Sequence, residues 1–246
     1  MARILFIMTG SDHWTLNDGT TTPTGYWAEE AIVPLQAFEA ASHEVVVATP
    51  GGIKSPLDPA SLRVEDGDHY RRIDAASPAL NHPVPLDSVS AADFDAVYVP
   101  GGHGPMEDLA VDAVSGALLT AFRDAAKPVG AVCHGPAALL AATRADGTNT
   151  FAGSTITCFT NEEETLAGSA PRAPWLLQTR LEEAGVAVRT AAPFDERIAL
   201  INLLLDALLT EAHASETAER ALEAATDEVD GVRDHAKQAE ERRQSR

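Results

Sequence analysis

Short apolar runs alternate with amphipathic stretches along most of the chain, and each pattern predicts one kind of element. The short apolar runs predict strands at residues 2–8, 44–48, 96–99, 128–132, 154–159 and 186–191. Apolar residues at helical spacing predict helices over residues 26–41, 114–125, 137–142, 174–184 and 198–213. Strands that alternate with helices indicate an α/β fold, a three-layer sandwich whose mainly parallel sheet carries helices on both faces.

Two regions depart from this alternation. Residues 58–86 have mixed polarity and several prolines, so we expect them to form an excursion off the main sheet. Residues 214–246 are rich in Ala, Glu and Arg and have few large apolar side chains, which is typical of a solvated helix or a disordered tail. We therefore expect one α/β domain over residues 1–213 and an acidic tail over residues 214–246 that folding and chemistry do not require.

Composition narrows the class of protein. The net charge of −19 argues against binding to nucleic acid or to an anionic membrane. No apolar run approaches the roughly 18 residues of a membrane span, and no secretory leader is recognisable. Two cysteines give no disulfide framework, and no Cys/His spacing is typical of a zinc site. We expect a cytoplasmic protein with neither a membrane nor a nucleic-acid partner.

The segment 127–136, KPVGAVCHGP, places a cysteine where a predicted strand gives way to a helix. Such a turn holds its residue in strained backbone geometry above the sheet edge, as in the nucleophile elbow of hydrolases. We therefore expect Cys133 to be a nucleophile beside His134. The helix N-terminus and the histidine are both expected to lower the pKa of Cys133. The alternative is a buried structural cysteine, which is our interpretation of Cys158.

Two segments near the predicted sheet edge carry further candidates, each with two interpretations. Glu29 and Glu30 follow Trp27 near a helix start, where an acid either interacts with the helix dipole or, when buried, exchanges protons with substrate or thiol. Gly101 and Gly102 follow a buried strand, and their N–H groups either belong to an ordinary turn or form an oxyanion hole with that of His134.

Three consecutive acids at residues 162–164 follow the strand predicted at residues 154–159. Such a run is usually the solvated start of a helix. Because this run lies at the same edge of the sheet, one of the three acids is alternatively the group that orients His134, as in a Cys–His–acid triad. Of the loop histidines, only His103 lies near this edge.

The combination of these segments resembles the ThiJ/PfpI superfamily, whose members have a flavodoxin-like, class I glutamine amidotransferase-like fold. The closest likeness is to its heat-shock protein 31 branch, which includes glyoxalase III enzymes. The matching segments cover residues 2–195 in the right order and are TGYWAEE at 24–30, ATPGG at 48–52, VPGGHGPMEDL at 99–109, AVCHGP at 131–136 and TCFTNEEE at 157–164.

The resemblance implies a role for each matching residue. It assigns the nucleophile to Cys133, its partner to His134, the acid that contacts the cysteine to Glu30 and the third triad member to Glu164. Gly102 and His134 match the backbone oxyanion donors. The resemblance also implies that no cofactor or metal is required and that the protein forms a homodimer. One departure is that residues 195–197 run directly into the helix predicted at 198, where relatives insert a strand hairpin.

The function that we predict is cofactor-independent conversion of methylglyoxal, or a related 2-oxoaldehyde, to a 2-hydroxy acid. One alternative is hydrolysis or hydration of another small electrophile, such as an amide or isocyanide, by the same cysteine. A non-enzymatic alternative is a stress-response holding chaperone or an oxidation sensor. Substrate turnover that disappears in Cys133→Ala distinguishes an enzyme from a chaperone, because holding activity survives that change.

Overall fold

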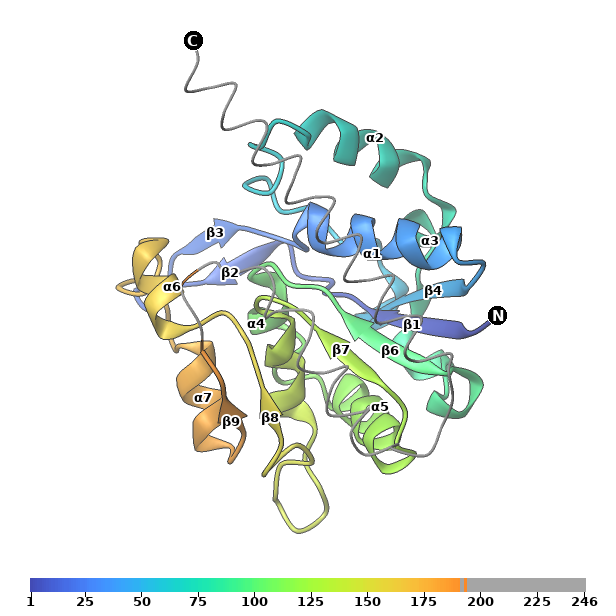
Figure 1. Ribbon diagram of the computed structural model, residues 1–246. Helices are drawn as coiled ribbons and strands as arrows, with labels where there is room; N and C mark the ends of the chain where they lie inside the picture. The colour runs from blue at the N-terminus through green and yellow to red at the C-terminus, as the bar shows by residue number, and fades with distance from the viewer. Residues whose placement is uncertain (191–192, 194–246) are drawn as a thin grey trace. The chain divides into compact units, whose positions relative to one another are not determined.

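A computed structural model describes residues 1–190 and 193, and its centre is a five-stranded parallel sheet (Figure 1). The strands run in the order β5–β4–β1–β6–β7 across the sheet. Their bounds are β1 Arg3–Ile7, β4 Glu44–Thr49, β5 Val84–Pro85, β6 Ala96–Val99 and β7 Val129–Ala131. The predicted α/β fold with a mainly parallel sheet is therefore confirmed.

Helices cover both faces of this sheet, with α1, α2 and α3 on one face and α5 on the other (Figure 1). The α-helices are α1 Ala28–Ala40, α2 Gly67–Ala76, α3 Pro78–Asn81, α4 Gly104–Glu107, α5 Ala113–Asp124, α6 Asn161–Leu166 and α7 Leu177–Glu183. Short 3-10 helices are η1 Pro50–Gly52, η2 Leu86–Ser88, η3 Ala91–Asp93 and η4 Gly135–Ala141. The segment predicted as a helix after Cys133 is thus the 3-10 helix η4.

Strand β1 is buried on both faces, as a central parallel strand must be when helices cover the sheet on both sides. Ile4 and Phe6, together with Met8 just after the strand, belong to an apolar core that also contains residues of α1. Leu5 and Ile7 point the other way and belong to a second core that contains residues of α5 and η4. This arrangement explains why β1 is a continuous apolar run in the sequence.

Two small sheets lie beside the main one. Strands β2 His13–Thr15 and β3 Thr21–Pro23 form an antiparallel pair. Strands β8 Thr155–Ile156 and β9 Ala187–Val188 form a parallel pair separate from the five-stranded sheet. The predicted strand at residues 154–159 is therefore much shorter than expected, and Cys158 is a buried residue that follows it.

The prediction that residues 58–86 lie entirely off the main sheet is wrong for the last residues of this segment. Val84 and Pro85 pair in parallel with Ala48 and Thr49, so the segment returns to the main sheet as its edge strand β5. A two-residue strand that contains proline is typical of an edge, where one side of the strand needs no ladder partner. The intervening helices α2 and α3 lie over α1 and β4 (Figure 1).

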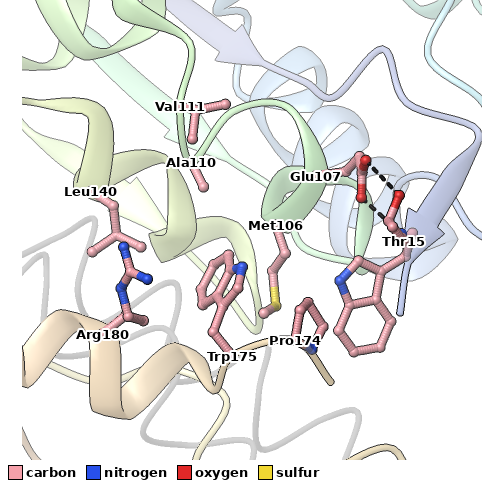
Figure 2. Close-up of a pocket in the computed structure, with 10 residues that line it drawn as sticks. Thr15, Met106, Glu107, Ala110, Val111, Leu140, Pro174, Trp175 and Arg180 are labelled. Atoms are coloured by element: carbon pink, nitrogen blue, oxygen red, sulfur yellow. Dashed lines mark hydrogen bonds between the residues drawn. The ribbon is translucent and has the colours of Figure 1, made fainter. Parts of the chain in front are cut away.

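The predicted helix at 198–213, the tail at 214–246 and the missing hairpin at 195–197 lie outside the described residues. Within the described part of the chain, no helix is both long enough and apolar enough to cross a membrane. A pocket of about 330 Å³ opens between β2, α4, η4 and the start of α7 (Figure 2).

Candidate active site

Cys133 occupies a turn between β7 and η4 with φ of 55°, the left-handed region that non-glycine residues rarely adopt. Backbone hydrogen bonds hold the peptide on both sides of this residue. Val132 N–H donates to Val99 O at 3.2 Å, and Phe159 N–H donates to Cys133 O at 2.8 Å. The surrounding chain thus determines the strained conformation, as expected for a nucleophile elbow.

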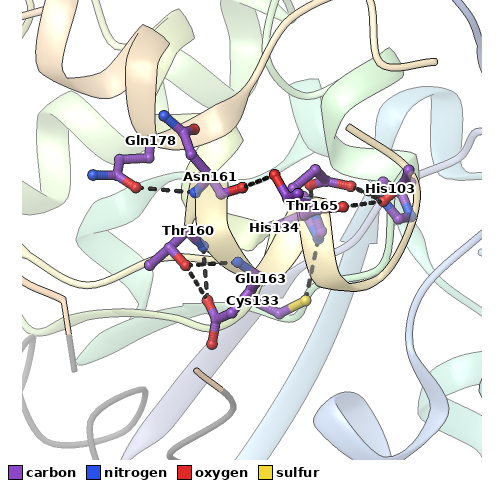
Figure 3. A network of polar contacts seen from close by, with 10 residues as sticks. His103, Cys133, His134, Thr160, Asn161, Glu163, Thr165 and Gln178 are labelled. Atoms are coloured by element: carbon purple, nitrogen blue, oxygen red, sulfur yellow. Dashed lines mark hydrogen bonds and ion pairs between the residues drawn. The ribbon is translucent and has the colours of Figure 1, made fainter. Parts of the chain in front are cut away.

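His134 contacts the thiol of Cys133 (Figure 3) and, through its other ring nitrogen, a buried carboxylate. Its Nδ1 is 3.2 Å from Cys133 Sγ, and its Nε2 is 2.6 Å from Glu164 Oε2. Burial lowers the pKa of His134 to about 4, and nearby His103 adds to the shift, so the imidazole is neutral near neutral pH. A neutral ring whose Nε2–H donates to a carboxylate has a free lone pair on Nδ1. His134 is therefore arranged to accept the proton of the Cys133 thiol.

Glu164 is buried on α6, although it follows two other acids in the sequence. Helix α6 begins with a capping box in which Thr160 and Glu163 satisfy each other's backbone N–H groups. This cap directs Glu163 toward the helix start and leaves Glu164 facing the site. Burial alone raises the pKa of Glu164, but hydrogen bonds from His103 and His134 outweigh it and hold that pKa well below its usual value.

The second oxygen of Glu164 has partners that the sequence did not reveal. His103 Nε2 lies 3.1 Å from Glu164 Oε1, and Ser169 Oγ donates to the same oxygen. His103 is 61 residues from Glu164 in the sequence, and Ser169 is five residues beyond it, after the end of α6. No local sequence motif indicates either contact. The sequence placed His103 near the sheet edge without assigning it a partner.

Four aromatic rings are in contact in a row through the catalytic histidine, with the first pair stacked and the other two pairs tilted. Trp14 stacks on His103 with ring centroids 4.3 Å apart and an interplanar angle of 18°. The centroids of His103 and His134 are 4.2 Å apart, and those of His134 and Phe159 are 4.4 Å apart. This row of rings restricts the rotation of His134, so that Glu164 and Cys133 stay on opposite sides of its ring.

Glu30 approaches Cys133 from α1 and hydrogen-bonds to its side chain. Glu30 Oε2 also accepts the N–H of Gly101 at 2.9 Å, whereas Glu29 is exposed. Position 101 must be glycine, because a Cβ there would lie 2.5 Å from Glu30 Oε2 and 2.6 Å from Cys133 Cβ. Burial raises the pKa of Glu30 to about 8, so its carboxyl group is protonated near neutral pH.

The expectation that Cys133 has a lowered pKa is wrong. Burial raises the pKa of Cys133, and so does the negative charge that Glu30 acquires above about pH 8, while the N–H groups of Gly102 and His134 act in the opposite direction. The adjacent histidine is neutral and therefore supplies no positive charge to the thiolate. Burial also raises the pKa of Cys158, so neither thiol ionises readily in the resting protein.

Backbone donors next to the sulfur come from two residues. Hydrogen bonds from the N–H groups of Gly102 and His134 reach the side chain of Cys133. The N–H of Gly101 instead donates to Glu30. Trp27 joins the site through its backbone, because its N–H donates to Gly101 O at 3.1 Å.

Potential metal ligands also occur at this position. Three potential ligand atoms lie within 4.8 Å of one another, one each from His103, His134 and Glu164. Both imidazole Nε2 atoms already contact the Glu164 carboxylate, one to each oxygen. These contacts account for the cluster as a hydrogen-bonded network.

Comparison with known proteins identifies relatives of this chain. The model of the DJ-1/PfpI family matches residues 22–206. The protein/nucleic acid deglycase HchA of Pseudomonas aeruginosa is 29% identical over 199 residues, which cover 76% of this chain and 68% of the relative. General stress protein 18 of Bacillus subtilis is 32% identical over 114 residues, or 46% of this chain and 57% of the relative.

Solved structures have the same fold. The 24-kDa rapid encystment protein of Francisella tularensis is 27% identical with a TM-score of 0.71, covering 79% of this chain and 86% of its own. Glyoxalase III from Candida albicans is 23% identical with a TM-score of 0.63, covering 78% of this chain and 83% of its own. The second likeness concerns the fold alone.

Proposed function

This chain belongs to the DJ-1/PfpI family, and from that premise we propose that it is a cofactor-independent enzyme of the glyoxalase III type. Its substrate is methylglyoxal or a related 2-oxoaldehyde, and its product is the 2-hydroxy acid. Cys133 is the nucleophile, and His134, Glu164 and Glu30 are its acid–base partners.

One observation carries the proposal: the two acid–base groups that flank Cys133 have pKa values displaced in opposite directions. Burial raises the pKa of Glu30 to about 8 and lowers that of His134 to about 4. Near neutral pH the carboxyl group is therefore the acid and the imidazole is the base. Such opposed shifts around one reactive atom are how a protein assigns acid and base roles. Isomerisation of an oxoaldehyde needs both.

The proposed reaction begins when His134 Nδ1 takes the thiol proton and Cys133 Sγ adds to the aldehyde carbon. Glu30 protonates the aldehyde oxygen, which completes a hemithioacetal. A base then removes the proton from C1, and C2 is protonated through an enediol, which yields a thioester of the 2-hydroxy acid. Water hydrolyses the thioester, releases the acid and restores the thiol. The N–H groups of Gly102 and His134 stabilise the carbonyl oxygen in these steps, typically by a few kcal/mol per donor.

A second candidate is favoured by the likeness to HchA, which is named as a protein/nucleic acid deglycase. Removal of an oxoaldehyde adduct from an amine, guanidine or thiol starts from a related carbon centre and uses the same nucleophile. The two candidates differ in what the enzyme binds, a free aldehyde or its adduct.

The test is a cofactor-free assay that follows methylglyoxal by NMR and identifies the acid formed. We expect lactate from the wild-type protein and none from Cys133→Ala, with Cys158→Ala as the matched control that retains turnover. Preformed adducts of methylglyoxal with N-acetylarginine and N-acetylcysteine are assayed in parallel. Lactate formed only from adducts supports the deglycase, and the absence of turnover from either source refutes both candidates.

The proposed enzyme acts as a cytoplasmic homodimer. Sedimentation of the purified full chain measures its mass directly, and a monomer at micromolar concentration contradicts this part of the proposal.

A further inference from the structure

The pocket of about 330 Å³ shown in Figure 2 is not lined by Cys133, His134 or Glu164, and the chemistry proposed above does not use it. Trp14 separates the two regions: it lines the pocket, and it also stacks on His103. The volume falls in the range of small-molecule sites, which begins at roughly 300 Å³. A ligand here would contact the row of rings in the active site without reaching Cys133.

Polar and apolar groups contribute about equally to the walls of the pocket, and the apolar part is contiguous with Trp14. Met106, Leu140, Pro174 and Trp175 line it together with Trp14. Val111 lies at the same pocket and is 78% exposed. The apolar side chains of the wall are suited to an apolar or aromatic body, because burying such a body away from water is favourable.

The two charged side chains of the pocket lie at opposite ends, Arg180 beside Trp175 and Glu107 beside Thr15 (Figure 2). Glu107 already accepts the backbone N–H and the hydroxyl of Thr15, at 2.8 Å and 2.9 Å. Arg180 lies over the Trp175 ring, and its contact with Glu183 is long, 3.8 Å, and exposed. An anionic group is therefore attracted to the end of the pocket at Arg180 and repelled from the end at Glu107.

One buried polar group in the wall also lacks a partner. Trp14 is 2% exposed, and its indole Nε1–H has no acceptor among the described residues. A buried donor without an acceptor costs free energy, roughly 1–3 kcal/mol. A ligand oxygen within reach of this N–H would remove that cost.

We propose that this pocket binds a small carboxylate with an apolar or aromatic body, whose anionic group lies toward Arg180 and whose body packs between Trp14 and Trp175. The site is separate from Cys133 and does not depend on the function proposed above. Because the ligand contacts Trp14, it lies one ring away from His103.

The test uses the full chain and intrinsic fluorescence, since Trp14 and Trp175 line the pocket and Trp27, the only other tryptophan, does not. The probes are 3-phenylpropanoate and its uncharged amide. We expect a saturable change in fluorescence that Trp27→Phe retains. The acid should bind about two- to fivefold more tightly than the amide, the scale of one partly exposed ion pair.

Arg180→Gln should abolish the difference between acid and amide, while Arg144→Gln, which removes an arginine paired with Asp124 outside the pocket, should preserve it. Four outcomes overturn the proposal: no saturable change with either probe, equal affinities in the wild-type protein, a difference that persists in Arg180→Gln, or a signal that Trp27→Phe abolishes. Because binding does not require turnover, failure here is distinguishable from failure of the proposed enzyme activity.

Discussion

Glu164 contacts His134 Nε2 at 2.6 Å, and this contact determines which nitrogen of the ring faces the thiol. The carboxylate is ionised, because hydrogen bonds from two histidines hold its pKa well below the usual value. An ionised carboxylate only accepts, so Nε2 carries the proton of the neutral ring. The lone pair then lies on Nδ1, 3.2 Å from Cys133 Sγ.

Glu164→Gln tests this arrangement. Glutamine has nearly the same shape, but its amide can donate to Nε2 and stabilise the other tautomer, which places a proton between Nδ1 and the sulfur. We expect kcat to fall by roughly 100- to 10,000-fold. Glu162→Gln, an exposed change on the same helix, is the control and should leave kcat unchanged. A fall of less than fivefold in Glu164→Gln would contradict the assigned tautomer.

His103→Phe removes the contact with Glu164 Oε1 but keeps an aromatic ring between Trp14 and His134. Displacement of the carboxylate should lower kcat by roughly 10- to 100-fold with little change in KM. The groups facing His134 are Cys133, Glu164, His103 and Glu163. Because His103 lowers the pKa of His134, its loss should move the acid limb of the kcat/KM profile to higher pH.

The control for that variant is His69→Phe, an exposed histidine on α2, which should leave the profile unchanged. An acid limb in His103→Phe that stays in place or moves to lower pH would show that His103 does not act on His134. A change confined to KM would assign His103 to substrate binding.

The elements that the sequence predicted well are those determined by local pattern. The apolar run at residues 96–99 is strand β6, and the abrupt change from apolar run to HGP marks the elbow at Cys133. The elements that it missed depend on distant partners. Strand β5 is only Val84 and Pro85, and nothing in that dipeptide indicates that it pairs with β4.

The chemistry of the site divides in the same way. Cys133 was identifiable because its neighbours in the sequence form the turn, but its pKa depends on Glu30, which is remote in the chain and adjacent only in the fold. The sequence-based prediction considered the nearby helix end and the adjacent histidine but not burial. Burial raises the pKa of Cys133 and lowers that of His134. The pairing of His103 with Glu164, 61 residues apart, was likewise unavailable to a local reading.

Glu30→Gln should reduce kcat by about 100-fold or more, the scale of one acid–base group. The wild-type kcat/KM should also decline as pH rises through about 8, where Glu30 loses its proton. The variant should lack that decline, since its amide does not titrate. Glu29→Gln is the control on the exposed side of α1. A larger loss in Glu29→Gln than in Glu30→Gln would mean that the acid is assigned to the wrong residue.

Iodoacetamide should modify Cys133 faster than Cys158, because Cys133 is only partly buried and Cys158 is buried. The raised pKa of Cys133 means that its rate should still be increasing with pH above neutrality. Glu30→Gln removes one negative charge and should accelerate the reaction at alkaline pH. Mass spectrometry of the two peptides measures both rates. A wild-type rate that reaches its plateau below neutral pH would show that the thiolate is more stable than burial implies.

The pH dependence of stability provides a test of Glu30 that is independent of catalysis. The pKa of Glu30 is about 8 in the folded protein, and that of an unperturbed glutamate, as in the unfolded chain, is 4.5. Between pH 4.5 and about pH 8 the folded chain therefore holds a proton that the unfolded chain has released. The free energy of unfolding therefore falls as pH rises across this window. Below the window, the stabilising contribution of Glu30 no longer changes with pH. Glu30→Gln lacks this titration, and its Tm relative to wild type should rise steadily with pH through the window. Glu39→Gln, an exposed change near the end of α1 whose charge is not among those that shift the pKa of Glu30, should follow the wild-type curve. A Tm difference between Glu30→Gln and wild type that is constant, or that shrinks as pH rises, would show that Glu30 is ionised in the folded protein near neutral pH and cannot be the acid of the proposed mechanism.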